Sequence, residues 1–180
     1  AFLAIDRTLA RPRDHWLARE ILQFMKRTLK RLDLTAKCFI ALIEPCSCFA
    51  GALLELALAE DQSFMLDDPD QPTAIAMSVL NGGALPMSTG LTRLQTRFLG
   101  EPDKVEKLLA IGEAIEPHVA LQTGLVSFTP DELDWDDEIR LMLEGRASLS
   151  PDALTGLEAN LRFAGPGTLE TKILDRKSVV

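Results

Sequence analysis

The stretch from Ile43 to Asp61, IEPCSCFAGALLELALAED, constrains the fold of this chain most. From Phe49 to Ala59 every residue is apolar or glycine except Glu55. The run is too short to cross a bilayer and too long for one strand, so it predicts a buried helix. Burying an ionised carboxylate is costly unless it is paired or hydrogen-bonded, and desolvation raises its pKa toward the range useful for proton transfer. Glu55 is therefore either a functional acid/base or a structural group that pairs with a nearby arginine or lies at a subunit contact.

The turn before this helix adds a second candidate feature. The first residues of a helix have backbone N–H groups without an intrahelical partner, and here they include those of Gly51 and Ala52. Such donors suit an anion or a developing oxyanion. Glu55 lies one turn further along, on about the same face. The pattern predicts that free donors and a desolvated carboxylate converge at one point.

The composition limits the classes of partner. The chain has 180 residues, of which 47% are hydrophobic and 26% charged, which suits one globular domain with a sizeable core. A net charge of -8 argues against a general nucleic-acid binder or an anionic-membrane binder. Lys26, Arg27, Lys30 and Arg31 form a local basic band, which is either a solvated helix face or a phosphate contact. No leader and no apolar run of spanning length is seen, so we expect a cytoplasmic protein outside the membrane.

Cysteine and histidine usage argues against a metal site. The three cysteines, Cys38, Cys46 and Cys48, are odd in number and lie near one another, which predicts reduced thiols. With only His15 and His118 as further ligands of this class, we expect no bound metal. The last residues, 175–180, do not continue the sequence pattern of the preceding segment. We interpret them as a sequencing artefact.

Periodicity predicts strands first and helices later. Apolar residues at helical spacing predict an amphipathic helix over Asp14–Leu32, with Asp14 as its cap. We expect strands at Cys38–Ile43, Ser63–Leu66 and Ala74–Leu80, and a glycine-rich loop at Asn81–Pro86. Further helices are predicted at Gly90–Phe98, Asp103–Ile111, Glu116–Gln122, Pro130–Leu143 and Pro151–Arg162, with Gly124–Phe128 extended. This order indicates an α/β core followed by a helical region.

Several long strings resemble one known family. ALIEPCSCFAGALLELALAED resembles the helix-opening segment of the crotonase (enoyl-CoA hydratase/isomerase) superfamily. RDHWLAREILQFMKRTLKRLD, NGGALPMSTGLTRLQTRF and DWDDEIRLMLEGRASLSPDALTGLEANLRFAGP resemble, more narrowly, lyases of that superfamily that act on an epoxide of benzoyl-CoA; this likeness covers nearly all of residues 13–174. The resemblance implies an incomplete crotonase-like spiral of β-β-α units. We expect a partial core over 1–128 and a helical region over 129–174, within an internal fragment of a longer protein.

The resemblance also implies a mechanism. The family's lyases open the epoxide ring with water and release formate, using acid/base groups and an oxyanion hole. The resemblance implies no metal or redox cofactor, and coenzyme A is part of the substrate. On this likeness Glu55 is one of two catalytic glutamates, the Ala52 N–H is an oxyanion donor and Gly51 keeps the turn tight. The full-length protein is expected to be a homo-oligomer.

The chain departs from the family's pattern at two positions. The second glutamate is expected at position 79, where this sequence has Val79, and valine can neither deliver a proton nor accept one. Cys46 stands where glycine is expected. We therefore expect this piece to be inactive. Two alternatives stay open: a non-catalytic module that binds CoA thioesters, and an enoyl-CoA hydratase/isomerase. The second is disfavoured because ordinary hydratases are not expected to contain the strings HWLARE and SLSPDALTGLEANLRF.

Overall fold

The computed structural model describes residues 2–11 and 15–162 of the chain. Two parallel strands, β1 (Ile40–Ile43) and β2 (Gln62–Met65), pair along their whole length. Parallel strands need a crossover connection, and here it consists of the 3₁₀ turn η1 (Gly51–Leu53) and the helix α3 (Leu54–Ala59). The predicted strand, turn and helix are therefore present, although the helical segment begins with η1 at Gly51 rather than at Phe49, and the α-helix itself begins at Leu54.

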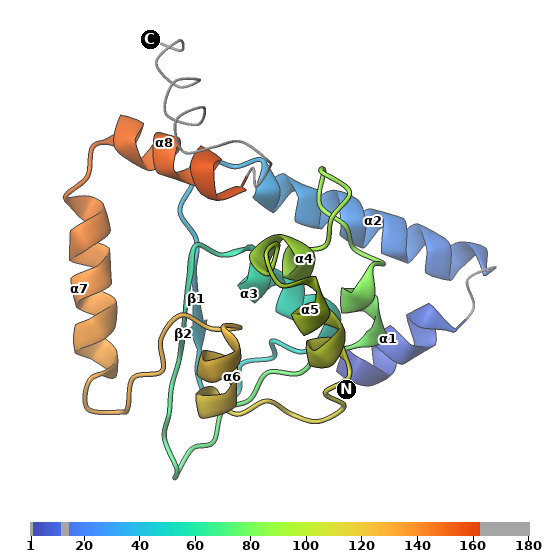
Figure 1. The fold of residues 1–180 in the computed structure, drawn as a ribbon, viewed down its shortest axis with the longest axis horizontal. Coiled ribbons are helices and arrows are strands. Elements are labelled where there is room, and N and C mark those ends of the chain that lie inside the picture. The colour runs from blue at the N-terminus through green and yellow to red at the C-terminus, as the bar shows by residue number, and fades with distance from the viewer. Residues whose placement is uncertain (1, 12–14, 163–180) are drawn as a thin grey trace.

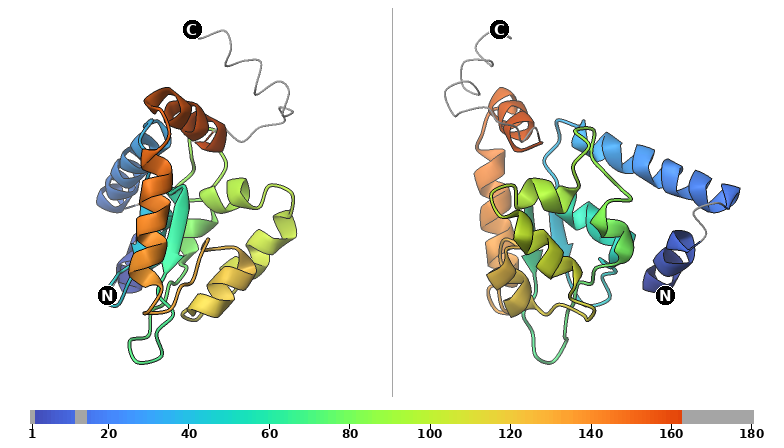
Figure 2. Two further views of the ribbon diagram at one scale, coloured as in Figure 1. Left: turned by 90° about the vertical axis from the view of Figure 1, so that its left-hand side faces the viewer. Right: turned by 45° about the vertical axis from the view of Figure 1, so that its right-hand side comes forward.

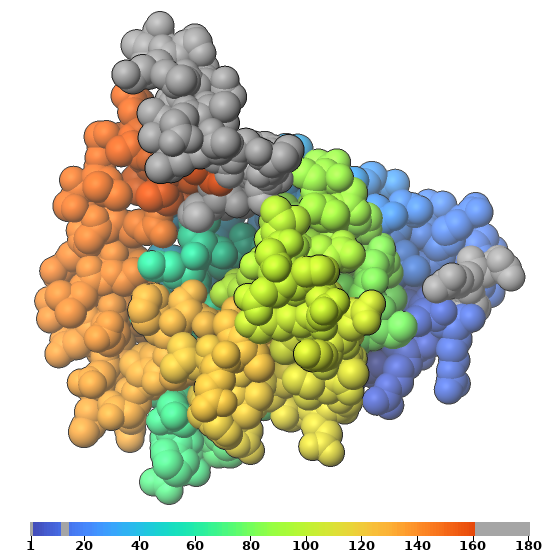
Figure 3. Space-filling view, in the orientation of Figure 1, coloured from blue at the N-terminus to red at the C-terminus, as the bar shows by residue number. Residues whose placement is uncertain are grey.

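Helices surround this small sheet (Figure 1). They are α1 (Phe2–Ala10), α2 (Trp16–Asp33), η2 (Val79–Gly82), α4 (Arg93–Arg97), α5 (Pro102–Leu109), α6 (Pro117–Thr123), α7 (Trp135–Ala147) and α8 (Pro151–Arg162). α7 lies on one side of the sheet, and α1 with α2 lies on the other (Figures 1 and 2). The atoms of α4, α5 and α6 cover the front between these flanks (Figure 3).

The main core lies between the sheet and the helices that follow it. α3 is buried because its face is apolar, and it packs with the strands and with α4, α5 and α6. The central residues of this core are Ile43, Leu54, Met65, Ile75, Leu94, Leu108, Ile115 and Ala120. A second cluster joins α2 to the turn regions through Leu29, Ala52, Leu80 and Leu85. The turn that carries the predicted site is thus held between two cores.

α7 covers the outer face of the strands. Trp135 packs with Phe64 and Leu66, and its ring N–H donates to Glu44 Oε1 at 3.0 Å. The helix begins at Trp135, later than predicted, because Asp131 accepts hydrogen bonds from the backbone of Leu133 and Asp134 and holds those residues in a turn. The division into a core over 1–128 and a helical region over 129–174 stays a prediction.

One predicted strand is wrong. Within Ala74–Leu80, only Ile75 and Ala76 form isolated bridges, to Ile115 and to Ala50, and η2 begins at Val79. The Ser78 side chain accepts from the Leu80 backbone, and the Asn81 side chain accepts from the Ser78 backbone. This cap turns the chain before a strand can continue. Ile75, Met77 and Leu80 are buried by packing against helices rather than by strand pairing, and Val79 is exposed.

The N-terminal region contains a helix that was not predicted. α1 carries the apolar residues Phe2, Leu3 and Leu9, but it is short and only Asp6 and Leu9 are buried. The predicted cap Asp14 lies outside the described residues, as do the strings after residue 162 and the suspected artefact at 175–180. In the part that is described, no helix is long and apolar enough to cross a membrane.

Candidate active site

Glu55 is buried inside a network of charged groups. Its side chain is on the inner face of α3, and the residue is 1% exposed. Arg93 of α4 donates from Nη1 to Glu55 Oε2 at 3.1 Å and from Nη2 to Asp33 Oδ1 at 2.8 Å. The predicted burial is confirmed. Of the two interpretations offered for it, the structure shows the pairing with a nearby arginine.

Burial nevertheless perturbs this carboxyl group. Desolvation raises the pKa of Glu55 above its usual value. The hydrogen bond from Asn81, and the positive charge and hydrogen bond of Arg93, oppose that rise. Two carboxylates, those of Glu55 and Asp33, share a single guanidinium, which leaves an excess of negative charge inside the protein. Glu55 therefore takes up a proton more readily than an exposed glutamate does, which is the property that a general acid needs.

Asn81 ties this network to the turn before α3. Its amide nitrogen donates to Glu55 Oε1 at 2.7 Å and to the Gly51 carbonyl at 3.0 Å. Its amide oxygen accepts from the Ser78 backbone at 2.8 Å. One buried side chain thus fixes the positions of Glu55, the Gly51 turn and the start of η2 relative to one another.

The expectation of free backbone donors at Gly51 and Ala52 is wrong. The Gly51 N–H donates to the Ala76 carbonyl at 2.8 Å. The Ala52 N–H donates at 2.7 Å to Oδ2 of Asp6, a residue of α1. The donor is therefore present and directed at an anion, but the anion belongs to the chain itself. Gly51 has a φ of 58°, and an added Cβ would overlap Asp6 Oδ2, which explains the glycine in physical terms.

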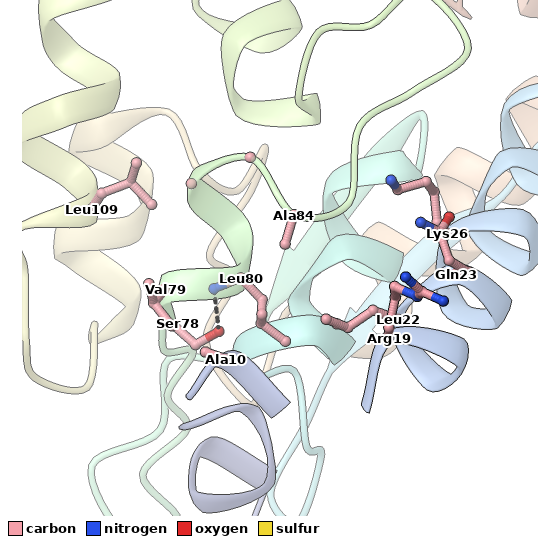
Figure 4. Close-up of a pocket in the computed structure, with 12 residues that line it drawn as sticks. Ala10, Arg19, Leu22, Gln23, Lys26, Ser78, Val79, Leu80, Ala84 and Leu109 are labelled. Carbon is pink, nitrogen blue, oxygen red and sulfur yellow. Dashed lines mark hydrogen bonds between the residues drawn. The ribbon is translucent and has the colours of Figure 1, made fainter. Parts of the chain in front are cut away.

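Val79 lies beside a cleft of about 850 Å³ (Figure 4). The valine is 66% exposed, in contrast to the buried Glu55. One wall of the cleft comes from η2 and from Gly83 and Ala84 after it, and the other comes from α2, whose Arg19 and Lys26 line it. Its lining residues are Ala10, Arg19, Leu22, Gln23, Lys26, Ser78, Val79, Leu80, Gly82, Gly83, Ala84 and Leu109. Neither Glu55 nor Ala52 is among them, so the structure brings the predicted site residues together without opening them to this cleft.

The cysteines lie apart from this cleft. All three are free thiols, as predicted. Cys46 has a φ of 71°, a conformation that favours glycine, in agreement with the residue type expected from the resemblance.

Cys38, Asp61 and Glu158 place three possible ligand atoms within 4.8 Å of one another. Burial and the neighbouring Glu158 raise the pKa of the Cys38 thiol to about 11, so it is protonated near neutral pH. The predicted absence of a metal stays a prediction.

Five residues of the site were not predicted from the sequence: Asp6, Asp33, Ser78, Asn81 and Arg93. Asp6 and Arg93 are ordinary charged residues in amphipathic segments, and nothing in the local pattern distinguishes them from solvated charges. Ser78 and Asn81 carried a signal, since a Ser followed three residues later by an amide side chain is typical of a capping box. This capping-box pattern predicts a turn at Ser78–Asn81 in place of the strand.

Comparison with known proteins shows what this chain is similar to. Over 177 residues the chain is 48% identical to a benzoyl-CoA-dihydrodiol lyase from Aromatoleum evansii, a match that covers 98% of this chain and 32% of that protein. The chain thus spans about a third of the relative's length. No protein-family model matches the chain.

Solved structures of similar fold include enoyl-CoA hydratases. An enoyl-CoA hydratase/isomerase from Cupriavidus metallidurans CH34 has a TM-score of 0.71 at 18% identity, covering 99% of this chain and 64% of that one. An enoyl-CoA hydratase from Geobacillus kaustophilus HTA426 has a TM-score of 0.67 at 22% identity, covering 93% of this chain and 61% of that one. At these identities the likeness concerns the fold, and it confirms the expected incomplete crotonase-like α/β architecture.

Proposed function

Because this chain has a crotonase-type fold and is related in sequence to part of a benzoyl-CoA-dihydrodiol lyase, we propose that it is a segment of a lyase acting on an aromatic CoA thioester. The proposed substrate is an epoxide of benzoyl-CoA, whose ring is opened with water and which then releases formate. The thioester would bind in the cleft beside Val79. Acid/base groups and an oxyanion site would supply the chemistry, without a metal or redox cofactor. A homo-oligomeric state and a cytoplasmic location also remain predictions.

The cleft carries this proposal. Its volume of about 850 Å³ is in the range of small-molecule and cofactor sites. Val79, Leu80, Ala84 and Leu109 provide apolar walls that suit an aromatic acyl group.

A cationic wall faces the apolar one. Arg19 and Lys26 lie two turns apart on α2, and neither forms an ion pair within the described residues. Unneutralised cations in a chain of net charge -8 suit the phosphates of coenzyme A. Of the predicted basic band, only Lys26 lines the cleft; Arg27, Lys30 and Arg31 do not.

We propose further that the piece binds substrate without turning it over. Val79 stands where the second carboxylate is expected, Glu55 is held by Arg93 and Asn81, and the Ala52 N–H is bound by Asp6. The same pairings favour the second candidate, a non-catalytic module that binds CoA thioesters. The two candidates agree on binding and differ only in what a longer protein does with its substrate.

Binding is testable on the chain itself. We expect isothermal titration calorimetry with benzoyl-CoA to show one site, and the double variant Arg19→Gln/Lys26→Gln to bind at least roughly tenfold more weakly, since a charge-assisted hydrogen bond contributes about 2 kcal/mol. The matched control is Lys30→Gln/Arg31→Gln, which removes the same charge from the same helix outside the cleft. Equal affinity for both double variants would refute the assignment of the cleft, and absence of binding by the unaltered chain would refute the proposed function.

A further inference from the structure

The solvent face of α2 is apolar along its first half and basic along its second half. Leu17, Ile21 and Phe24 are four and three residues apart, so they share one side of the helix, and Phe24 is 64% exposed. Arg27 and Arg31 continue the same side and are exposed, and neither forms an ion pair within residues 2–11 and 15–162. We call these five residues the α2 face. An exposed apolar patch beside unneutralised charges is typical of a surface that binds another molecule.

A hollow between β2 and α7 has a complementary shape. Its volume is about 340 Å³, and its apolar lining includes Phe128, Leu141 and Leu149. Phe128 and Leu149 are each 43% exposed, and Leu141 is 56% exposed. α7 and α2 lie on opposite sides of the sheet (Figures 1 and 2). The α2 face and this β2–α7 hollow therefore cannot meet within one chain.

The rim of the β2–α7 hollow is acidic. Residues 131–138 (DELDWDDE) contain six acids and no base. Arg140 neutralises part of this charge, but Asp134 and Glu138 form no ion pair within the described ranges, and Glu138 itself lines the hollow. Asp134, Glu138 and Leu141 share one side of α7, because they are four and three residues apart. Carboxylates thus stand beside an apolar hollow, as the arginines of the α2 face stand beside its apolar residues.

We propose that this chain associates head to tail with a second copy of itself, so that the α2 face of one copy docks on the β2–α7 hollow of the next. Phe24 is the anchor that enters the hollow. The two arginines of the α2 face meet the carboxylates of Asp134 and Glu138. An aromatic anchor in an apolar pocket with a charged rim is a usual arrangement of the dominant contacts at protein interfaces. Because the two surfaces differ, each copy in a dimer keeps one surface unused, and association continues to rings or chains.

A membrane surface is the other class of partner that a basic helix face with aromatic residues can bind. The net charge of -8 opposes approach to an anionic bilayer, whereas the same charge includes the acidic rim that a second copy offers. Each surface also carries a charge of the other sign, Glu20 on α2 and Arg146 at the hollow, and these two charges are opposite to each other. The second copy is therefore the better match. The inference is independent of the proposed function, because no residue of the α2 face or of the hollow lines the cleft beside Val79.

Sedimentation velocity of the 180-residue chain over a range of concentrations tests the contact. We expect the unaltered chain to form dimers and larger species as its concentration rises, and Phe24→Asp and Leu141→Asp each to stay monomeric. An equal mixture of the two variants should form a dimer and nothing larger, since each variant keeps one intact surface that only the other variant can use. The matched control is Leu99→Asp, which alters a residue that is 52% exposed outside both surfaces and should associate like the unaltered chain.

Two results of this experiment would overturn the proposal. One is an unaltered chain that stays monomeric at every concentration. The other is continued association by Phe24→Asp alone or by Leu141→Asp alone, because this would mean that two like surfaces meet.

Exchanging the charges tests the ion pairs without removing an apolar side chain. We expect Arg27→Glu/Arg31→Glu and Asp134→Lys/Glu138→Lys each to associate at least about tenfold more weakly, because like charges then face one another. Asp134 makes no capping hydrogen bond to α7, so its replacement leaves the helix intact. An equal mixture of the two double variants should recover the association of the unaltered chain. A mixture that associates no better than its components would overturn the assigned pairing.

Cosedimentation with vesicles of phosphatidylglycerol and phosphatidylcholine distinguishes the membrane from the second copy. We expect the unaltered chain to stay in solution. Vesicle binding that Phe24→Asp abolishes, by a chain that does not associate with itself, would overturn the proposal and assign the α2 face to a membrane surface.

Discussion

Glu55 and Asp33 face one guanidinium, and the stability of this arrangement depends on Arg93. The arginine is 3% exposed and has no replacement cation among the described residues that contact either acid. Removing one partner of a buried ion pair leaves an uncompensated charge in a medium of low polarity, which costs far more than the pair contributes. The network is therefore a place where a single substitution has a large effect.

We expect Arg93→Ala to lower the free energy of unfolding by about 3 to 5 kcal/mol, measured by urea denaturation at pH 7. Arg140→Ala is the matched control, because Arg140 pairs with Asp137 and Glu144 on the exposed face of α7. That variant should unfold like the unaltered chain. Similar losses for the two variants would show that the network around Glu55 is not as buried as the structure indicates.

The raised pKa of Glu55 predicts a pH dependence of stability. The folded protein takes up this proton at a higher pH than the unfolded chain, whose value is near 4.5. The cost of burying the charge is fully present where Glu55 is ionised in both states. As the pH falls through the folded pKa toward 4.5, the free energy of unfolding should rise relative to that of Glu55→Gln, by at most about 1.4 kcal/mol per pH unit. Urea denaturation of both proteins from pH 8 to pH 4.5 measures this difference, and a difference that stays constant or falls would contradict it.

At the scale of elements, the turn between β1 and α3 is held by α1, a helix that was not predicted from the sequence. Gly51 has both a positive φ and a carboxylate against its Cα. Gly90 also has a positive φ, of 88°, but has open space where its Cβ would be. Comparing substitutions at the two glycines therefore separates the free-energy cost of the backbone conformation from the cost of the contact with Asp6.

We expect Gly51→Ala to destabilise the protein by about 2 kcal/mol more than Gly90→Ala. Both changes place a side chain in the left-handed region at a cost of about 1 to 2 kcal/mol, and only the first also displaces Asp6 from its two donors, the Ala52 N–H and the Ser78 hydroxyl. Thermal and urea unfolding of the two variants measure the difference. In an Asp6→Ala background the excess should shrink, because the contact is already lost. An excess that is unchanged there would mean that Asp6 is not what excludes a side chain at position 51.

For the whole molecule, the cleft joins segments from four parts of the chain, and Val79 is its most informative residue. Because Val79 is largely exposed, Val79→Glu should change the free energy of unfolding by no more than about 0.5 kcal/mol. We expect neither the 180-residue chain nor its Val79→Glu variant to release formate from the epoxide of benzoyl-CoA. Formate release by the unaltered chain would contradict the proposed inactivity.

A protein of the relative's full length provides the complementary comparison. With Glu at the position of Val79 it should release formate, and with Val it should not, because one carboxylate cannot both deliver water and return a proton. Equal release with Val and Glu would remove the proposed role of this position. If neither form releases formate while both bind benzoyl-CoA, the binding-module candidate is supported.

The amino-acid sequence by itself determined the strand, turn and helix around Glu55, the helix α2 and the later helices, because these segments carry their own periodicity and apolar faces. It also determined that Glu55 is buried, since no helix with that composition can leave the residue in water. The resemblance read from its strings identified the fold. Capping chemistry at Ser78 and Asn81, though local, was overlooked, and the predicted strand there was wrong.

Only the tertiary structure decided which groups meet Glu55 and the Ala52 amide. Asp6, Arg93 and Asp33 are distant in sequence, and each would be an ordinary solvated charge in its own segment. Their pairing follows from the way α1, α2 and α4 pack around one turn. Local patterns fix which faces are buried, whereas long-range packing fixes which buried polar groups meet. At this site, packing sets both the pKa of Glu55 and the acceptor of the Ala52 N–H.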